Sequence, residues 1–171
     1  IVGTGGRCDG MFIMPLATEF GASARMVAFC DPSRIRMKYW IDELARLHDF
    51  HEPIALYLPE EFDGLLSREK PDVVIVCSTD ATHAEYIVRS LKAGCDVIVE
   101  KPLANTMEEA RELLKLTRES KIKMQVGHVE RFNPAFLSIA DLEINPMFIE
   151  VHRLAQFNPR GTEVSVILDL M

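Results

Sequence analysis

The stretch 72–77, Asp-Val-Val-Ile-Val-Cys, constrains the fold more than any other part of the sequence. Its apolar residues do not alternate with polar ones, which is typical of a strand buried on both faces of a sheet. Such strands occur mainly in parallel sheets that helices cover on both sides. Other short β-rich runs alternate with helical patterns, as in consecutive βαβ units. The sequence therefore predicts an α/β protein with a doubly wound parallel sheet.

The same alternation places the individual elements. Strands are expected at 1–2, 25–30, 54–58, 72–77, 97–99 and 123–126. Helices are expected after the glycines at 3–6, over 34–49, around 60–66, over 84–91 and from 107 onward. Apolar spacing predicts inward side chains on the first and last of these helices, namely Met11, Met14, Leu16 and Phe20, and Met107, Ala110, Leu113, Leu114 and Thr117. Gly94 suits a left-handed helix end, and 106–109 suits a capping box.

The pattern changes near residue 127, where we expect a domain boundary. Residues 1–127 would form a dinucleotide-binding Rossmann domain, and residues 128–171 the incomplete beginning of an α+β substrate domain. In this second part we expect a short helix at Asn133-Pro134, a strand over 147–153 and a helix from Gly161. Both ends of the chain lie inside regular patterns, so we expect a fragment.

Composition and charge exclude several classes of protein. Hydrophobic residues make up 48% of the chain, which suits a packed core, and the net charge of −7 with no basic block argues against nucleic-acid binding. No apolar run is long enough to span a bilayer. The 4 cysteines form no CxxC pair and suit a reducing cytoplasm. His48 and His51 form an HxxH pattern without a third ligand, so no metal site is expected.

A glycine-rich turn stands between the first strand and the first helix, in the sequence GTGGRC at 3–8. Gly3, Gly5 and Gly6 permit a tight turn and a close approach of the backbone to a pyrophosphate, with Arg7 beside it. Cys8 occupies the position of the third glycine in a dinucleotide fingerprint. The turn by itself fits a cofactor loop and an ordinary glycine turn equally well.

Asp31 ends the second predicted strand, where a carboxylate can accept hydrogen bonds from both ribose hydroxyls of adenosine. This position favours NAD. Arg34 and Arg36 follow closely, and a guanidinium there suits the 2′-phosphate of NADP, so NADP stays open. A turn or a helix cap explains Asp31 equally well without any ligand.

Polar segments follow two neighbouring strands later in the chain. The sequence CSTDATH at 77–83 comes after the buried strand, and EKP at 100–102 comes after the next one. Ligands of open parallel sheets bind outside the carboxyl ends of the strands. Both segments are therefore expected to converge on the glycine turn.

These motifs together resemble the Gfo/Idh/MocA family, named for glucose-fructose oxidoreductase, inositol dehydrogenase and a rhizopine-catabolism protein. The resemblance is carried by GTGGR at 3–7, PDVVIVCSTDATH at 71–83, AGCDVIVEKPLA at 93–104 and GHVERFNP at 127–134. The family usually has Thr-Pro-Asn where this chain has Ser-Thr-Asp at 78–80. His83 stands at the family's usual histidine position.

The resemblance implies an NAD(P)-dependent oxidoreductase that transfers a hydride between nicotinamide and a carbinol carbon of a sugar, cyclic polyol or nucleotide sugar. Lys101 would be the active-site lysine, which suits a reaction that removes a hydroxyl proton. The expected cofactor-binding residues are Gly3, Gly5, Gly6, Arg7, Asp31, Arg34, Cys77, Ser78, Thr79, His83, Glu100, Lys101 and Pro102. The complete protein is expected to be a homo-oligomer.

The family's second catalytic pair is an Asp and a His four residues apart on one helix. Asp169 matches the Asp, and the His would follow shortly after Met171, so we expect the 171-residue chain alone to be inactive. Arg131, His152 and Arg153 are the candidates for the substrate side.

Other functions stay open at this point. The same scaffold supports reduction of a double bond, with the lysine as a positioning donor. A cofactor-binding regulator, or an inactive nucleotide-binding module, needs no turnover at all. A methyltransferase with a glycine loop gives no reason for the EKP motif.

Overall fold

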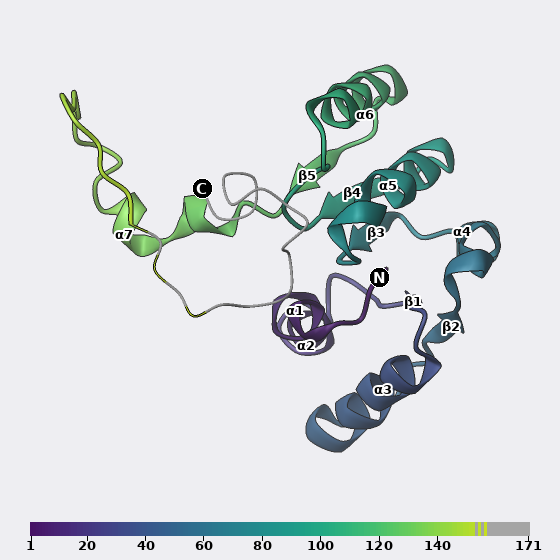
Figure 1. Cartoon of the computed structure of the whole chain (residues 1–171). Helices are drawn as coiled ribbons and strands as arrows, with labels where there is room; N and C mark the ends of the chain where they lie inside the picture. The colour runs from purple at the N-terminus through teal and green to yellow at the C-terminus, as the bar shows by residue number, and fades with distance from the viewer. Residues whose placement is uncertain (153, 155, 157–171) are drawn as a thin grey trace. The chain divides into compact units, whose positions relative to one another are not determined.

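The computed structural model describes residues 1–152, 154 and 156. The chain divides into two compact units, Ile1–Val126 and a second one that begins at Gly127. In the first unit, strands and helices alternate along the chain (Figure 1).

The strands of the first unit are all parallel. They are β1 (Ala28–Cys30), β2 (Ala55–Tyr57), β3 (Val73–Val76), β4 (Asp96–Val99) and β5 (Met124–Val126). Val2 forms parallel bridges to Cys30 on one side and to Val76 on the other. The sheet therefore runs in the order β2, β1, Val2, β3, β4, β5. The chain builds outward from Val2 to β2 and then returns to the other side of Val2, which confirms the doubly wound Rossmann topology.

Helical segments connect the strands. In the first unit they are α1 (Gly6–Cys8), the π-helical η1 (Asp9–Ile13), α2 (Met14–Ala17), α3 (Arg34–His48), η2 (Pro59–Glu61), α4 (Phe62–Glu69), η3 (Asp80–Thr82), α5 (His83–Lys92) and α6 (Met107–Ser120). The predicted capping box at Thr106 is present, with the threonine side chain accepting from the Glu109 N–H. Gly94 has a φ of +84°, the left-handed conformation expected after α5.

The strands bury most of their side chains. Val74 and Val76 of β3 and Val99 of β4 belong to one core cluster, whereas Phe29 of β1 packs in a second cluster with the first helices. Val73 begins β3 and is exposed, so burial on both faces starts one residue later than the apolar run suggests. Each fully buried aliphatic side chain contributes about 1.5–3 kcal/mol.

Two predicted helix faces are wrong in part. In the first helical region Met11 and Phe20 are exposed, whereas Cys8 and Ile13 are buried. The wider π-helical turn of η1 rotates the following residues away from the 3.6-residue spacing that the prediction assumed. In α6, Met107 and Leu114 are exposed and only Leu113 is buried. The face of α6 that packs against the core is therefore narrower than the apolar face that the sequence pattern predicts.

The second unit contains η4 (Val129–Phe132) and α7 (Pro134–Leu137), and α7 begins at the expected Asn133 cap. The strand predicted over 147–153 is absent from residues 147–152. A strand needs a neighbour to accept its backbone hydrogen bonds, and no described residue pairs with this segment. The helix expected from Gly161 lies outside the described residues.

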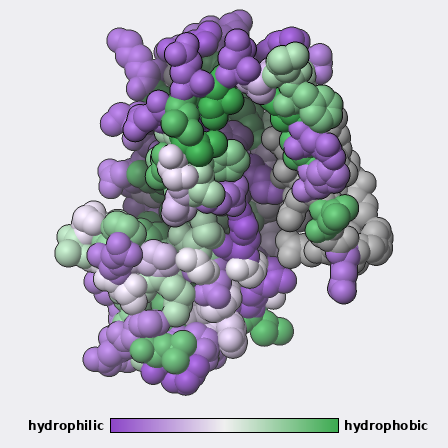
Figure 2. All heavy atoms as spheres, turned by 90° about the vertical axis from the view of Figure 1, so that its left-hand side faces the viewer, coloured by the Kyte–Doolittle hydropathy of each residue, from purple (hydrophilic) through white to green (hydrophobic). Residues whose placement is uncertain are grey.

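Apolar atoms reach the surface in several places among polar ones (Figure 2). None of the described residues from 127 onward is buried, and Phe132, Phe136 and Met147 are strongly exposed. No core therefore forms among the described residues of the second unit. Over the described part of the chain, no helix combines the length and the apolar character that crossing a membrane requires.

Candidate functional site

The glycine turn lies directly after Val2, where the strand order reverses, and it contacts the end of β3. Gly3 has a φ of +81°, and a Cβ atom there would lie 2.6 Å from the carbonyl carbon of Cys77 and from the Ser78 nitrogen. Only glycine fits this position. A Cβ on Gly5 or Gly6 would meet no atom within 4 Å. The turn is therefore tight against β3 on one side and open on the other, as a backbone cradle for a phosphate group must be.

Thr4 fastens the turn from inside. It is fully buried, and its N–H and hydroxyl donate to Asp31 Oδ2 over 2.8 and 3.0 Å. The indole N–H of Trp40, on α3, donates to the Thr4 carbonyl over 2.8 Å. The sequence analysis missed both Thr4 and Trp40. The position of Thr4 between the glycines of the turn could have predicted its role, whereas no local sequence pattern indicates a role for Trp40.

Asp31 follows β1 as expected, but its carboxylate is bound by groups of the chain itself. The residue is 2% exposed. Besides the two bonds from Thr4, Oδ1 accepts from the Ser33 N–H over 2.8 Å, and Arg36 Nη1 lies 3.4 Å from Oδ2. Asp31 thus holds the glycine turn against the start of α3. Arg34, the arginine expected near the cofactor, forms an exposed ion pair with Glu61 over 3.1 Å.

Glu100 differs from Asp31 in its partners. It directly follows β4 and is 5% exposed, and its Oε2 lies 3.4 Å from Nε of the half-exposed Arg7. Its Oε1 is buried and has no hydrogen-bond partner among the described residues. A buried polar atom without a partner is rare in folded proteins, and it is expected where a ligand supplies the missing donor. The Arg7 contact also joins the glycine turn to the EKP segment.

The segments after β3 and β4 meet through His83. This residue is 1% exposed, with its Nδ1 2.7 Å from the Pro102 carbonyl and its Nε2 3.2 Å from the Ser78 carbonyl. Cys77 lies against Cys8, whose thiol raises the pKa of Cys77 together with burial. A raised pKa of this thiol disfavours the thiolate, which is the nucleophilic form of cysteine. Ser78 is half-buried and Thr79 exposed beside them, and the partly exposed Lys101 stands between Glu100 and Pro102.

Two of the expected substrate-side residues are described in the second unit. Arg131 lies on η4 and is exposed, and His152 is exposed with its Nε2 against the Glu150 carboxylate. Arg153 and Asp169 lie outside the described residues. Within the described ranges, no three His, Cys, Asp or Glu residues are grouped as metal ligands.

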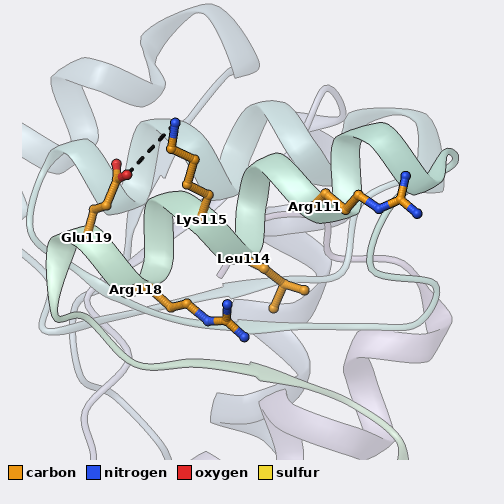
Figure 3. A pocket seen from close by; sticks show the side chains of 5 residues that line it. All are labelled: Arg111, Leu114, Lys115, Arg118 and Glu119. Atoms are coloured by element: carbon orange, nitrogen blue, oxygen red, sulfur yellow. Dashed lines mark ion pairs between the residues drawn. The ribbon is translucent and has the colours of Figure 1, made fainter.

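A separate open hollow lies on the surface of α6. Its lining residues all come from that helix and are Arg111, Leu114, Lys115, Arg118 and Glu119. Figure 3 shows Lys115 and Glu119 together, joined by an ion pair of 4.0 Å, and Leu114 and Arg118 on the opposite side. None of the expected site residues lines it. A solvated helix face explains the hollow fully.

The topology and the turn together define a dinucleotide-binding Rossmann domain. A glycine turn at the reversal of strand order, followed by polar residues at the carboxyl ends of the next strands, is the arrangement that such domains share. The open space over Gly5 and Gly6 and the unpartnered Glu100 Oε1 both fit a bound dinucleotide.

Comparison with known proteins identifies the family. Residues 1–128 match the Gfo/Idh/MocA family model, an oxidoreductase family with an NAD-binding Rossmann fold, and the chain belongs to this family. It is 34% identical to the YteT protein of Bacillus subtilis over 82% of this chain and 32% of that protein. It is 32% identical to inositol 2-dehydrogenase of Paracoccus denitrificans, over 83% of this chain and 40% of that enzyme.

A solved structure shows the same fold. The 3-ketoreductase KijD10 of Actinomadura kijaniata, in complex with NADP, superimposes with a TM-score of 0.66 at 25% identity, over 82% of this chain and 41% of that one. The chain spans about a third of the length of the curated relatives it matches, between 32% and 40% for the two enzymes compared above.

Proposed function

We propose that this chain forms the NAD(P)-binding part of an oxidoreductase that transfers a hydride between nicotinamide and a carbinol carbon of a sugar, cyclic polyol or nucleotide sugar. The observation that carries the proposal is the contact between Arg7 and Glu100, which joins the open glycine turn to the EKP segment. Family membership supports it, and so do the names of two relatives, an inositol 2-dehydrogenase and a 3-ketoreductase.

Each part of the site has a distinct task in this proposal. The backbone at Gly5 and Gly6 receives the pyrophosphate, and the segment after β1 receives the adenosine. Glu100 Oε1 accepts a hydrogen bond from a hydroxyl or amide group of the cofactor, which satisfies the unpartnered atom. A nicotinamide held at this site would accept or supply the hydride. Lys101 exchanges the proton of the carbinol hydroxyl as the hydride moves.

The remaining parts of the proposal concern the whole protein. The active form is a homo-oligomer in which Asp169 and residues of the second domain complete the substrate side. A reducing cytoplasm suits the four cysteines, which are all free thiols. A cofactor-binding regulator without turnover is the alternative, and the fully internal bonding of Asp31 suits it equally well.

Calorimetric titration with NADH and NADPH tests the proposal. Gly6→Asp places a carboxylate in the open space over the turn, so NADH affinity is expected to fall by at least about tenfold, or 1.4 kcal/mol. Gly10→Asp is the matched control, because a Cβ there also meets nothing within 4 Å. If the folded wild-type chain binds neither cofactor, or if both variants bind alike, the proposed site is wrong.

A further inference from the structure

His83 connects two segments that the sheet itself no longer holds together. The ladder between β3 and β4 closes with the Glu100 N–H, which donates to the Val76 carbonyl over 2.9 Å. Beyond that bond, the imidazole spans the gap between the Ser78 carbonyl and the Pro102 carbonyl. Pro102 is the residue directly after Lys101, so the ring acts on the backbone that carries the lysine.

The ring is anchored on the other side by a packed helix. His83 is the first residue of α5, whose Ile87 and Leu91 are buried in the core shared with β3 and β4. The loop before it is also tied down, because the Thr82 hydroxyl donates to the Thr79 carbonyl over 2.8 Å, and its oxygen lies at the same distance from the Ser78 hydroxyl oxygen. The imidazole therefore holds the loop at Pro102 in a fixed position relative to the packed helix α5.

The two contacts of the His83 ring, to the Pro102 and Ser78 carbonyls, cannot both be hydrogen bonds when the ring is neutral. A carbonyl oxygen only accepts hydrogen bonds, whereas a neutral imidazole has one N–H donor and one acceptor nitrogen. The shorter contact, 2.7 Å from Nδ1 to the Pro102 carbonyl, is a hydrogen bond only when Nδ1 carries the proton. In a neutral ring with its proton on Nδ1, the imidazole donates to the Pro102 carbonyl in the segment of Lys101, and the approach of Nε2 to the Ser78 carbonyl is then not a hydrogen bond.

We propose that His83 is a positioning residue that sets the orientation of Lys101 by donating from Nδ1 to the Pro102 carbonyl. This inference rests on the proposed role of Lys101. His83 then makes no contact with the cofactor or substrate. Both of its ring nitrogens already lie against carbonyl oxygens of the chain, which fits this role.

Two substitutions separate the two ring nitrogens. The amide nitrogen of His83→Asn takes the approximate place of Nδ1 and keeps a donor for Pro102, whereas that of His83→Gln reaches the place of Nε2 and loses it. Hydrogen exchange of a peptide covering 99–105 is compared with a peptide from α3, and the unfolding midpoint is recorded for each variant. Exchange at 99–105 is expected to be about tenfold faster in the Gln variant and near wild type in the Asn variant, with α3 unchanged in both.

Kinetics in an active form of the protein completes the test. Misplacement of a reacting group by about 1 Å costs about a hundredfold in rate, so His83→Gln is expected to lower kcat by tenfold to a hundredfold while NADH affinity stays within about threefold. His83→Asn is expected to recover most of kcat. Equal exchange and equal kcat for both variants would overturn the positioning role. If Lys101→Met leaves turnover intact, the proposed function fails separately, and the exchange data still decide whether His83 holds this segment.

Discussion

Two buried carboxylates stand at the ends of parallel strands on opposite sides of the glycine turn, and they are bonded in opposite ways. Asp31 is surrounded by donors from Thr4, Ser33 and Arg36. Among the described residues, the Glu100 carboxylate has a long contact from Oε2 to Arg7, and its Oε1 has no partner. Burial alone therefore does not identify a ligand-binding acid. The useful distinction is whether the chain itself already supplies the hydrogen-bond donors.

The difference divides the site into a closed side and an open side. On the closed side, around Asp31, hydrogen bonds within the chain shape the turn before any ligand arrives. On the open side, around Glu100, a ligand would complete the bonding of the buried Oε1 atom. Substitutions on the closed side should change stability, whereas substitutions on the open side should change binding and turnover.

The largest effect is expected at Lys101, on the open side. In an active form of the protein, Lys101→Met should lower turnover by ~10²–10⁴, the usual contribution of a positioned proton-transfer group. NADH affinity should stay within a few-fold, because the turn and the adenosine side are untouched. Steady-state kinetics and a binding titration measure the two quantities. Near wild-type turnover would show that the lysine is structural.

Gly3→Ala is expected to have the largest effect on stability. The added Cβ meets the backbone of Cys77 and Ser78 at 2.6 Å, in a conformation with positive φ. Backbone strain of this kind costs about 1–3 kcal/mol, and the displaced β3 end adds to it. Urea denaturation should show the loss. Gly10→Ala, where a Cβ meets nothing within 4 Å, is the control. Equal midpoints for the two variants would contradict the tight fit.

Asp31→Asn tests the closed side directly. The carboxamide NH2 of the variant can only donate, so it would face one of the N–H or O–H groups that now donate to Asp31. The unfolding free energy should therefore fall by about 1–3 kcal/mol without any cofactor present. Chemical denaturation of the unliganded protein measures this. An unchanged stability, combined with lost NADH binding, would mean that Asp31 serves the ligand and not the turn.

Glu100→Gln is the counterpart on the open side. Removing the charge leaves few internal bonds to lose, so stability should change by less than about 1 kcal/mol. NADH affinity should fall by about tenfold, since a charged acceptor forms a stronger hydrogen bond than a neutral one. Denaturation and calorimetric titration of the same sample give both values. If the unliganded Glu100→Gln variant loses as much stability as the Asp31→Asn variant, the closed and open sides do not differ in this respect.

The smallest effect concerns the choice between NADH and NADPH. Arg36 lies beside Asp31 and is half-exposed, whereas Arg34 is bound to Glu61. Arg36→Ala should therefore weaken NADPH binding by a few-fold relative to NADH, and Arg34→Ala should leave the ratio unchanged. Parallel titrations with both cofactors measure the ratio. A larger change in the ratio of NADPH to NADH affinity for Arg34→Ala than for Arg36→Ala would indicate that Arg34, and not Arg36, lies beside the 2′-phosphate.

Much of this arrangement was predictable from local patterns. The apolar run before Cys77 predicted β3, the glycines at 3–6 predicted the turn, and the EKP motif predicted the polar end of β4. The roles of Lys101 and the cofactor residues stay predictions. The helix faces around Met11 and Leu114 were wrong because a π-helical turn and a narrow contact stripe both depend on the surrounding packing.

The sequence by itself determined the order of strands and helices, the need for glycine at position 3, and the polar residues at the strand ends. These follow from periodicity and backbone sterics, which act within a few residues. Only the tertiary structure decided that Trp40 holds Thr4, that Arg36 and not Arg34 faces Asp31, and that Glu100 keeps an unpartnered oxygen. Each of these contacts joins residues that are far apart in the sequence. The number of hydrogen-bond donors around a buried carboxylate therefore depends on the tertiary fold, because residue type alone does not specify a residue's neighbours.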